Sequence, residues 1–272
     1  MKNKISFFFF CLFFLLGCCS IPTHLKISSL EEEKNINLIN RLENSSVALL
    51  EATPDGSKYL TFCGGVFITP DLILSARHCG EGIIPGKPEL TEELLNKPNK
   101  SLDDLLKIIN ILGYEPNLDE MIGAKVYFKT FSELATYYTK ENPPPKAAEI
   151  IKYDPGSDLM LLKTVNYSSE YFSEISESNG RIGGKAHIVG HPARVEFTYF
   201  SGNISGFRAE TFVKGKEQYF IHITAPVYMG NSGGGAFDNN GSLLGICSFF
   251  RKNVPNMSFF VDAETIKNFL NN

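Results

Sequence analysis

From Ser46 onward, the chain consists of short β-like runs separated by turn residues, and this spacing limits its fold more than any other feature. The run from Val47 to Leu50 leads to the turn residues Pro54-Asp55-Gly56, and the run 72–76 follows a second turn at Pro70-Asp71. Short strands with turn residues between them are typical of all-β proteins. At 272 residues, the chain is long enough for a double barrel of such strands. We therefore expect an all-β fold.

Two series of β-like runs can be distinguished, with a serine-rich linker at 168–180 between them. The runs of the first series lie at 47–50, 59–69, 72–76, 124–128, 148–153 and 158–164. The runs of the second series lie at 186–190, 195–201, 207–213, 218–224, 235–237, 243–249 and 257–261. Ile266, Phe269 and Leu270 then share one face of 263–270, which predicts a short C-terminal helix.

Residues 82–120 interrupt the first series with a different pattern. The segments 90–96 and 101–112 have apolar residues at helical spacing. Ser101 and Asp104 resemble a capping pair at the start of the second segment, and Gly113 is a typical helix stop after it. The pattern predicts a helical insertion in an otherwise β-rich chain.

The N-terminus has the features of a secretory signal peptide. A basic start with Lys2 and Lys4 precedes an apolar run from Ile5 to Leu16, which is too short to span a membrane comfortably. The run ends in Leu15-Leu16-Gly17-Cys18, which resembles a bacterial lipobox, whose cysteine is lipidated. We expect residues 1–17 to be removed and Cys18 to carry a lipid that anchors the chain to a membrane. Simple secretion is the alternative.

Residues 18–44 are polar and rich in lysine and glutamate. We expect them to form a tether, with no more than one or two helical turns near its end. The chain would then be an extracytoplasmic lipoprotein, either periplasmic or on the cell surface.

Composition excludes several classes of function. The formal charge is −4, from 26 basic and 30 acidic residues, and no basic stripe is present, so we expect no nucleic acid partner. The sequence contains no Cys/His spacing typical of zinc sites and no phosphate-binding loop. We therefore expect no metal ion and no cofactor.

The stretch Gly230-Asn231-Ser232-Gly233-Gly234-Gly235 can present a nucleophile. A serine among glycines lets a substrate backbone come close, because glycine has no side chain and tolerates strained turns. The backbone N–H groups of Gly230 and Ser232 can converge on one point and form an oxyanion hole. Taken alone, the hexamer fits a glycine-rich hairpin loop with an ordinary serine equally well.

Two upstream stretches supply the partners that a serine nucleophile needs. Ser75-Ala76-Arg77-His78-Cys79 places a histidine at the end of a predicted strand. Asp158 stands at the head of the apolar strand 159–162, and Asp154 is the second choice for the acid. His78 can accept the proton of the Ser232 hydroxyl, and Asp158 can fix the imidazole tautomer and stabilise the imidazolium.

These three motifs, in the order His78, Asp158 and Ser232, resemble those of the trypsin/chymotrypsin-like serine proteases. Val189-Gly190-His191-Pro192 and Asn231 are closer to the bacterial branch, such as the HtrA proteases and glutamyl endopeptidases. The resemblance covers about residues 45–270. It implies a chymotrypsin-like fold of two antiparallel six-stranded β-barrels and a serine endopeptidase that acts on protein or peptide substrates.

By this resemblance, an N-terminal barrel at 45–167 would carry His78, Asp158 and the insertion at 82–120. A C-terminal barrel at 168–272 would carry Ser232 and the terminal helix. Cys63, sixteen residues before Cys79, matches the family's cysteine pair around the catalytic histidine, so a disulfide between the two is implied.

The resemblance also assigns a substrate pocket, formed by the segments on either side of the nucleophile in the sequence. Its candidate residues are Pro226, Val227, Ser248, Phe249 and Phe250. The Ser248 hydroxyl would, in addition, support the catalytic aspartate. An apolar pocket narrowed by Phe250 favours a small or medium apolar side chain before the scissile bond.

Two alternatives to an active endopeptidase are a catalytically silent, protease-like binding module and a non-proteolytic esterase. The complete set of His78, Asp158 and Ser232 argues against the first. The order of the three residues differs from that of α/β-hydrolases, which argues against that form of the second. His187 and His222 alternate with apolar residues and are expected to be structural, and Cys247 is expected to be a buried thiol.

Overall fold

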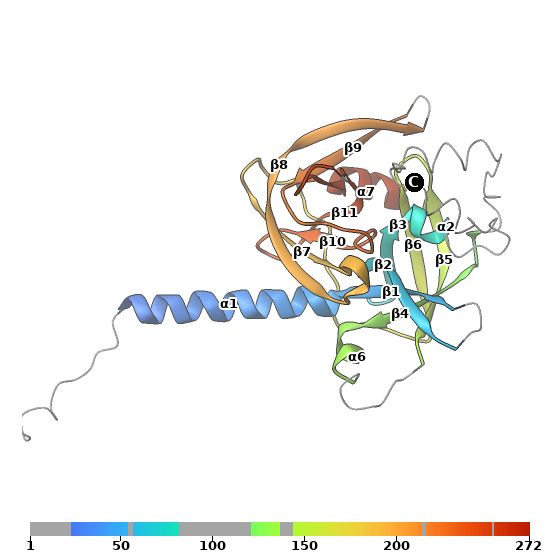
Figure 1. Ribbon diagram of the computed structural model, residues 1–272, viewed down its shortest axis with the longest axis horizontal. Coiled ribbons are helices and arrows are strands. Elements are labelled where there is room, and N and C mark those ends of the chain that lie inside the picture. Colours follow the sequence, from blue (N-terminus) through green and yellow to red (C-terminus); the bar gives the residue numbers. More distant parts are fainter. Residues whose placement is uncertain (1–22, 54–56, 82–120, 137–143, 214–215, 252) are drawn as a thin grey trace, which may run out of the picture. The chain divides into compact units, whose positions relative to one another are not determined.

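The computed structural model describes residues 23–53, 57–81, 121–136, 144–213, 216–251 and 253–272 (Figure 1). The chain divides into two compact units, 1–37 and 38–272. Helix α1, Thr23–Ser45, begins in the first unit and ends in the second. Both barrels belong to the second unit. The predicted signal segment 1–17, Cys18 and the insertion at 82–120 lie outside the described residues.

Six antiparallel strands close the first barrel, in the order β1-β2-β3-β6-β5-β4 (Figure 1). These strands are β1 Ser46–Ala52, β2 Tyr59–Phe67, β3 Leu72–Ala76, β4 Lys125–Thr130, β5 Lys146–Asp154 and β6 Leu159–Val165. Helix α2, Arg77–Glu81, follows β3 directly, and helix α6, Phe131–Thr136, follows β4. The sequence patterns did not predict either short helix.

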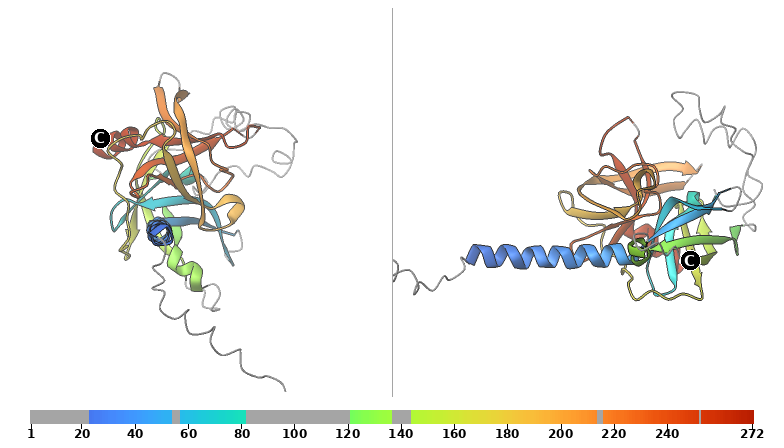
Figure 2. Two further views of the ribbon diagram at one scale, coloured as in Figure 1. Left: turned by 90° about the vertical axis from the view of Figure 1, so that its left-hand side faces the viewer. Right: turned by 60° about the horizontal axis from the view of Figure 1, so that its bottom comes forward.

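The second barrel is also closed by six antiparallel strands, in the order β10-β11-β12-β9-β8-β7 (Figures 1 and 2). These strands are β7 Lys185–Gly190, β8 Thr198–Val213, β9 Lys216–Ile223, β10 Gly235–Phe237, β11 Leu243–Phe250 and β12 Ser258–Asp262. The 3₁₀ turn η2, Pro192–Arg194, lies between β7 and β8, and helix α7, Ala263–Asn271, ends the described chain. The expected all-β double barrel is confirmed.

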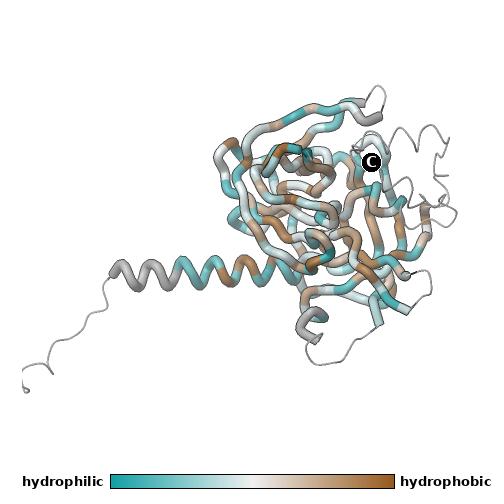
Figure 3. Tube along the Cα trace, in the orientation of Figure 1, coloured by the Kyte–Doolittle hydropathy of each residue, from teal (hydrophilic) through white to brown (hydrophobic). Residues whose placement is uncertain are grey.

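The apolar residues gather along the strands that form the two barrels (Figure 3). In β4, Val126 and Phe128 are fully buried and alternate with less buried neighbours, as expected for a strand with one face toward a core. In β6, by contrast, Leu159 to Leu162 are all buried, because this strand is covered on both faces. The side chain of Asp262 caps α7 by accepting a hydrogen bond from the Thr265 N–H at 2.8 Å.

Two expectations for local structure were wrong. Residues 23–45 form one long helix, where only one or two helical turns near residue 44 were expected. Many of these residues favour helices, and Leu42 near the helix end is fully buried in the barrel core. The hydroxyls of Ser45 and Ser46 both donate to the Leu42 carbonyl, at 3.0 and 2.8 Å, and so close the helix end.

The second correction concerns β8, which is one strand of 16 residues instead of two runs. The glycines between the two predicted runs do not end the strand. Gly202 lies where an added Cβ would be 2.2 Å from the Thr224 carbonyl oxygen, and the pairing of β8 with β9 shifts register between Ile204 and Gly206. These glycines therefore permit a close approach and a bulge within a continuous strand.

Candidate active site

The turn that carries Ser232 is held in shape by its own backbone. The Tyr228 carbonyl accepts hydrogen bonds from the Asn231 backbone N–H at 3.1 Å and from the Asn231 side-chain amide at 3.0 Å. The Gly234 N–H donates to the Asn231 carbonyl at 3.0 Å. Gly230 has a φ of 97°, a conformation that favours glycine. The side chain of Ser232 stands on this turn and is partly exposed.

Contacts with both barrels fix the position of this turn. The Gly64 N–H on β2 donates to the Ser232 carbonyl at 2.7 Å, and the Gly233 N–H donates to the Cys247 carbonyl on β11 at 2.8 Å. Gly233 has a φ of 79°, and an added Cβ there would lie 2.3 Å from the Gly64 carbonyl oxygen. Because only glycine fits, the second barrel's turn can lie directly against the first barrel.

His78 lies on α2, immediately after β3. The disulfide between Cys63 on β2 and Cys79 on α2 joins this helix to the neighbouring strand. The Ser75 hydroxyl donates to the Gly64 carbonyl at 2.7 Å, so the same segment of β2 contacts both the histidine strand and the serine turn. The histidine and the serine are therefore positioned by one common segment.

The carboxylate of Asp158 lies against the inner edge of the His78 ring. The Oδ2 atom of Asp158 is 2.9 Å from Nδ1 of His78, and its Oδ1 atom accepts from the His78 backbone N–H at 3.1 Å. The Ser248 hydroxyl on β11 donates to Oδ2 at 2.5 Å. Asp158 has a φ of 54°, which is uncommon for a residue other than glycine. Its side chain is 14% exposed and that of His78 is 36% exposed.

This geometry selects the tautomer of His78. With Nδ1 donating its proton to the carboxylate, Nε2 keeps a free lone pair and can act as a base. Asp154, the second choice for the acid, instead accepts from the Gly156 N–H at 2.9 Å within the turn before β6. The structure thus brings Asp158, and not Asp154, to His78.

The pKa values of the two residues favour a charged pair. Burial lowers the pKa of His78, but the charge of Asp158 and its hydrogen bond outweigh burial, so this pKa is raised above its ordinary value. Burial acts to raise the pKa of Asp158, but the charge and hydrogen bond of His78 and the hydrogen bond from Ser248 hold it below its usual range. An imidazolium opposite a carboxylate is therefore stabilised.

The predicted oxyanion donors have no competing partner among the residues that the structure describes. Within the described ranges, neither the Gly230 N–H nor the Ser232 N–H has a hydrogen-bond acceptor. The Met229 carbonyl accepts from the Ala193 N–H at 2.8 Å, which ties the peptide before Gly230 to the loop after β7. No hydrogen bond joins the Ser232 hydroxyl to His78 in the described structure; such contacts often tighten only when substrate binds.

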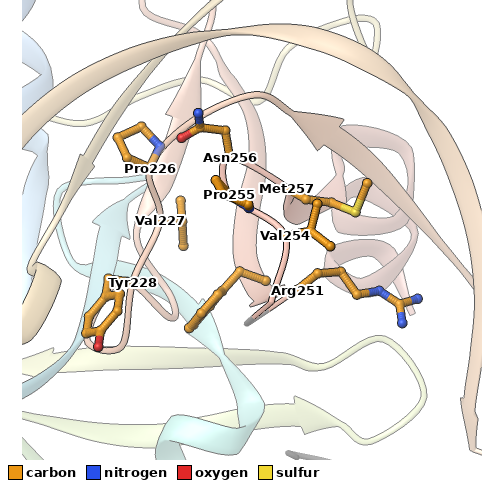
Figure 4. Close-up of a pocket in the computed structure, with 9 residues that line it drawn as sticks. Pro226, Val227, Tyr228, Arg251, Val254, Pro255, Asn256 and Met257 are labelled. Carbon is orange, nitrogen blue, oxygen red and sulfur yellow. The ribbon is translucent and has the colours of Figure 1, made fainter.

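A pocket lies in the second barrel, between the segment before the serine turn and the loop after β11 (Figure 4). It is lined by Pro226, Val227, Tyr228, Phe250, Arg251, Val254, Pro255, Asn256 and Met257. The rings of Tyr228 and Phe250 are stacked with their centroids 6.0 Å apart. The guanidinium of Arg251 pairs with Glu210 at 3.2 Å. Most of the other lining residues are apolar.

Three of the five residues that the sequence assigned to a substrate pocket line this one, namely Pro226, Val227 and Phe250. Ser248 instead bonds to Asp158, and the ring of Phe249 stacks on Phe259 with 4.5 Å between centroids. The sequence reasoning did not include residues 254–257, which follow β11 in a loop. Their only sequence signal is their position shortly after Phe250.

Residues 63–246, more than half of the chain, match the model of the trypsin-like peptidase domain. This chain belongs to the trypsin-like peptidase family. The resemblance drawn from the three motifs is confirmed.

Relatives of this trypsin-like peptidase domain include HtrA-type proteins. A probable periplasmic serine endoprotease DegP-like from Brucella suis is 36% identical over 102 residues, which are 36% of this chain and 20% of that protein. The periplasmic serine endoprotease DegP of Salmonella typhimurium is 29% identical over 100 residues, 36% of this chain and 21% of that protein. The chain therefore matches only about a fifth of the length of these relatives.

Solved structures share the fold of the domain. The active form of the Rv3671c protease from M. tuberculosis superposes with a TM-score of 0.59 at 16% identity, covering 88% of this chain and 85% of that chain. The HtrA-type protease AlgW with tripeptide superposes with a TM-score of 0.57 at 18% identity, covering 87% and 61% of the two chains. At these identities, the comparison establishes a common chymotrypsin-like architecture.

His191 has a role in the peptidase domain that the sequence did not indicate. Its side chain is 1% exposed, its Nε2 donates to the Val47 carbonyl of the first barrel at 3.0 Å, and its Nδ1 accepts from the Phe197 N–H at 3.0 Å. Burial lowers the pKa of His191 to about 4. A neutral histidine thus joins the loop after β7, which also contacts Met229, to the other barrel.

The two other histidines of the second barrel are buried. His187 is bonded through Nδ1 to the Tyr199 hydroxyl at 2.8 Å and through Nε2 to the Asn239 side chain at 2.9 Å, as expected for a structural histidine. His222 stacks on Phe259, and its Nε2 has no hydrogen-bond partner among the described residues. Cys247 is a buried free thiol, as expected.

Proposed function

We propose that this chain is a serine endopeptidase that hydrolyses peptide bonds through an acyl-enzyme intermediate on Ser232. The observation that carries the proposal is the Asp158 carboxylate, which is 2.9 Å from Nδ1 of His78 and is held in place by the Ser248 hydroxyl. This arrangement supports Nε2 of His78 as the base, on the side of the ring away from the carboxylate. The family membership of residues 63–246 supports the same reaction class.

The first half-reaction would use these groups in turn. His78 Nε2 takes the proton of the Ser232 hydroxyl while the serine oxygen bonds to the carbonyl carbon of the substrate. The negative charge that develops on the carbonyl oxygen is stabilised by the N–H groups of Gly230 and Ser232. The C–N bond then breaks, the amine leaves with the proton from His78, and the acyl group stays on the serine.

In the second half-reaction, water takes the place of the serine hydroxyl. His78 removes a proton from the water, whose oxygen attacks the acyl carbon, and the proton returns to the Ser232 oxygen as the ester breaks. Asp158 keeps its negative charge throughout and stabilises the imidazolium. Each oxyanion-hole donor of this kind contributes on the order of 10² to 10³ in kcat.

The substrate pocket next to the serine turn supports a preference for small or medium apolar residues before the scissile bond. Val227, Phe250 and Met257 give it apolar lining, and the charge of Arg251 is paired with Glu210. A well-buried methylene contributes about 0.8 kcal/mol, so a side chain that fits would be favoured several-fold for each such group. A peptide-library profile dominated by Arg, Lys or Glu at this position would contradict the assignment.

We also propose that the chain works outside the cytoplasm, held to a membrane by a lipid on Cys18. The signal-like segment 1–17 supports this location, and the DegP relatives from Brucella suis and Salmonella typhimurium are named as periplasmic. Among the described helices, none is long and apolar enough to cross a membrane. Mass spectrometry of the mature N-terminus tests the anchor: a chain cut elsewhere than before Cys18, and without lipid, would indicate simple secretion.

Labelling with a fluorophosphonate probe tests the proposed nucleophile. The wild-type chain should be labelled on Ser232, and Ser232→Ala should abolish labelling and lower peptide hydrolysis by roughly four to six orders of magnitude. Ser201→Ala, at an exposed serine on β8, is the matched control and should keep both activities. A folded wild-type chain that neither reacts with the probe nor cleaves a peptide library would be a silent binding module.

A further inference from the structure

The short helix that carries His78 also carries a partly buried ion pair. Arg77 precedes His78, and its guanidinium Nη1 contacts the Glu81 carboxylate one turn later on α2. The two side chains are 19% and 21% exposed. Neither residue has a part in the proton transfers described above.

Arg77 is held next to the carboxylate that orients His78. Its Nε atom is 4.0 Å from Oδ1 of Asp158, and its backbone N–H donates to the Asp158 carbonyl at 2.9 Å. The Nε atom is buried and has no hydrogen-bond partner in the described part of the chain. A charge at such a site is screened by water and salt less than a charge on the open surface.

We propose that Arg77 and Glu81 act as an electrostatic pair that sets how readily His78 takes up a proton. The Arg77 guanidinium favours the Asp158 carboxylate and disfavours a positive imidazolium, while the Glu81 carboxylate acts in the opposite direction. Arg77 is therefore a positioning residue for the His78–Asp158 pair. Consistent with this geometry, Arg77 lowers the pKa of His78 and Glu81 raises it.

Apart from Asp158, the groups that other elements of the described structure place around His78 are uncharged, so the two charges on α2 are the ones that adjust its proton affinity. From β11, Asp158 is faced by the neutral Ser248 hydroxyl and by the Cys247 thiol, whose pKa burial raises far above its usual range. Among the described residues, the charged groups that act on His78 are Asp158, Arg77 and Glu81. Removing Arg77 or Glu81 should thus shift the His78 titration in opposite directions.

Direct titration of His78 by NMR tests the pair. The full chain with Ser232→Ala is the background, because it cannot cleave itself and needs no substrate. Arg77→Met should raise the pKa of His78 by roughly half a unit or more, and Glu81→Gln should lower it by a similar amount. The double variant should return close to the background, and Arg77→Lys, which keeps the charge, should shift the pKa least.

In the chain with Ser232 intact, the same substitutions should move the acidic limb of the pH profile of kcat/KM in the same two directions. Only this consequence rests on the proposed function, since the NMR titration detects His78 whether or not the chain cleaves peptides. Equal-sign shifts, or shifts below about 0.2 units in both single variants, would overturn the electrostatic pair. If circular dichroism shows that Arg77→Met does not fold, the sign of the Glu81→Gln shift decides alone.

Discussion

Acidification should destabilise this protein through His191, and the effect can be worked out from its surroundings. The imidazole is buried, donates a hydrogen bond from Nε2 to the Val47 carbonyl and accepts one at Nδ1 from the Phe197 N–H. A proton added to Nδ1 would remove the acceptor that Phe197 needs and place a charge at a buried site where, among the described residues, no carboxylate compensates it. The folded state therefore resists protonation down to a pKa of about 4.

The size of the effect follows from this shift. A fall in pKa from 6.5 to about 4 corresponds to about 3 kcal/mol, at 1.36 kcal/mol per pKa unit. Because the unfolded chain binds the proton more tightly, this stability is fully present above pH 6.5 and is lost as the pH falls toward 4. At pH 5, about 2 kcal/mol should already be lost through His191.

Urea unfolding of the wild type and of His191→Gln at pH 8 and pH 5 measures this loss. Glutamine keeps one donor and one acceptor but does not titrate, so it should cost about 1 kcal/mol at pH 8 through imperfect hydrogen bonds. At pH 5, the variant should match or exceed the wild type in free energy of unfolding, because the other titrating groups are common to both proteins. An equal pH dependence in the two proteins would refute the reasoning.

His78→Gln is the control of opposite sign. The pKa of His78 is raised in the folded state, so its contribution to stability is present below pH 6.5 and is lost as the pH rises through the folded pKa. Removing it should therefore weaken the protein more at pH 5 than at pH 8.

Two further variants test the contacts that position His78 and the serine turn. Replacing Cys63 and Cys79 with serine opens a disulfide across 16 residues and should lower the free energy of unfolding by about 3 kcal/mol, measured in urea with and without reductant. Gly233→Ala should abolish fluorophosphonate labelling and destabilise the fold by more than about 2 kcal/mol, because its Cβ would lie 2.3 Å from the Gly64 carbonyl oxygen. Gly183→Ala is the matched control, since Gly183 also has a positive φ but no neighbour near the added Cβ; equal losses in both variants would contradict the steric argument.

Much of the fold could be predicted because its signals are local. In 72–76, an apolar run ends at a turn on one side and at His78 on the other, and the structure places β3 at those residues. Helix α7 likewise follows from apolar residues at helical spacing, of which Ile266 and Phe269 are buried. Periodicity and turn chemistry act over a few neighbouring residues, so one sequence is enough to read them.

The proximity of His78 and Asp158 could also be predicted, because their short motifs resemble those of a family in which the matching residues lie together in the folded protein. The sequence did not contain the reasons for that proximity. Asp158 adopts a positive φ and accepts from Ser248, 90 residues away, and Gly233 lies against Gly64 of the other barrel. The Ser248–Asp158 and Gly233–Gly64 contacts join the two barrels, and no local pattern encodes them.

The sequence alone determined that the chain is all-β and supplied the candidates for its reactive residues, since both depend on patterns within short segments. Only the tertiary structure decided that 195–213 holds one bent strand, that 23–45 is one helix whose end is buried, and that the loop at 254–257 lines the pocket. It also gave His191 a partner 144 residues away. Burial and hydrogen-bond satisfaction depend on residues distant in the chain, so they are fixed only when the two barrels close and pack together.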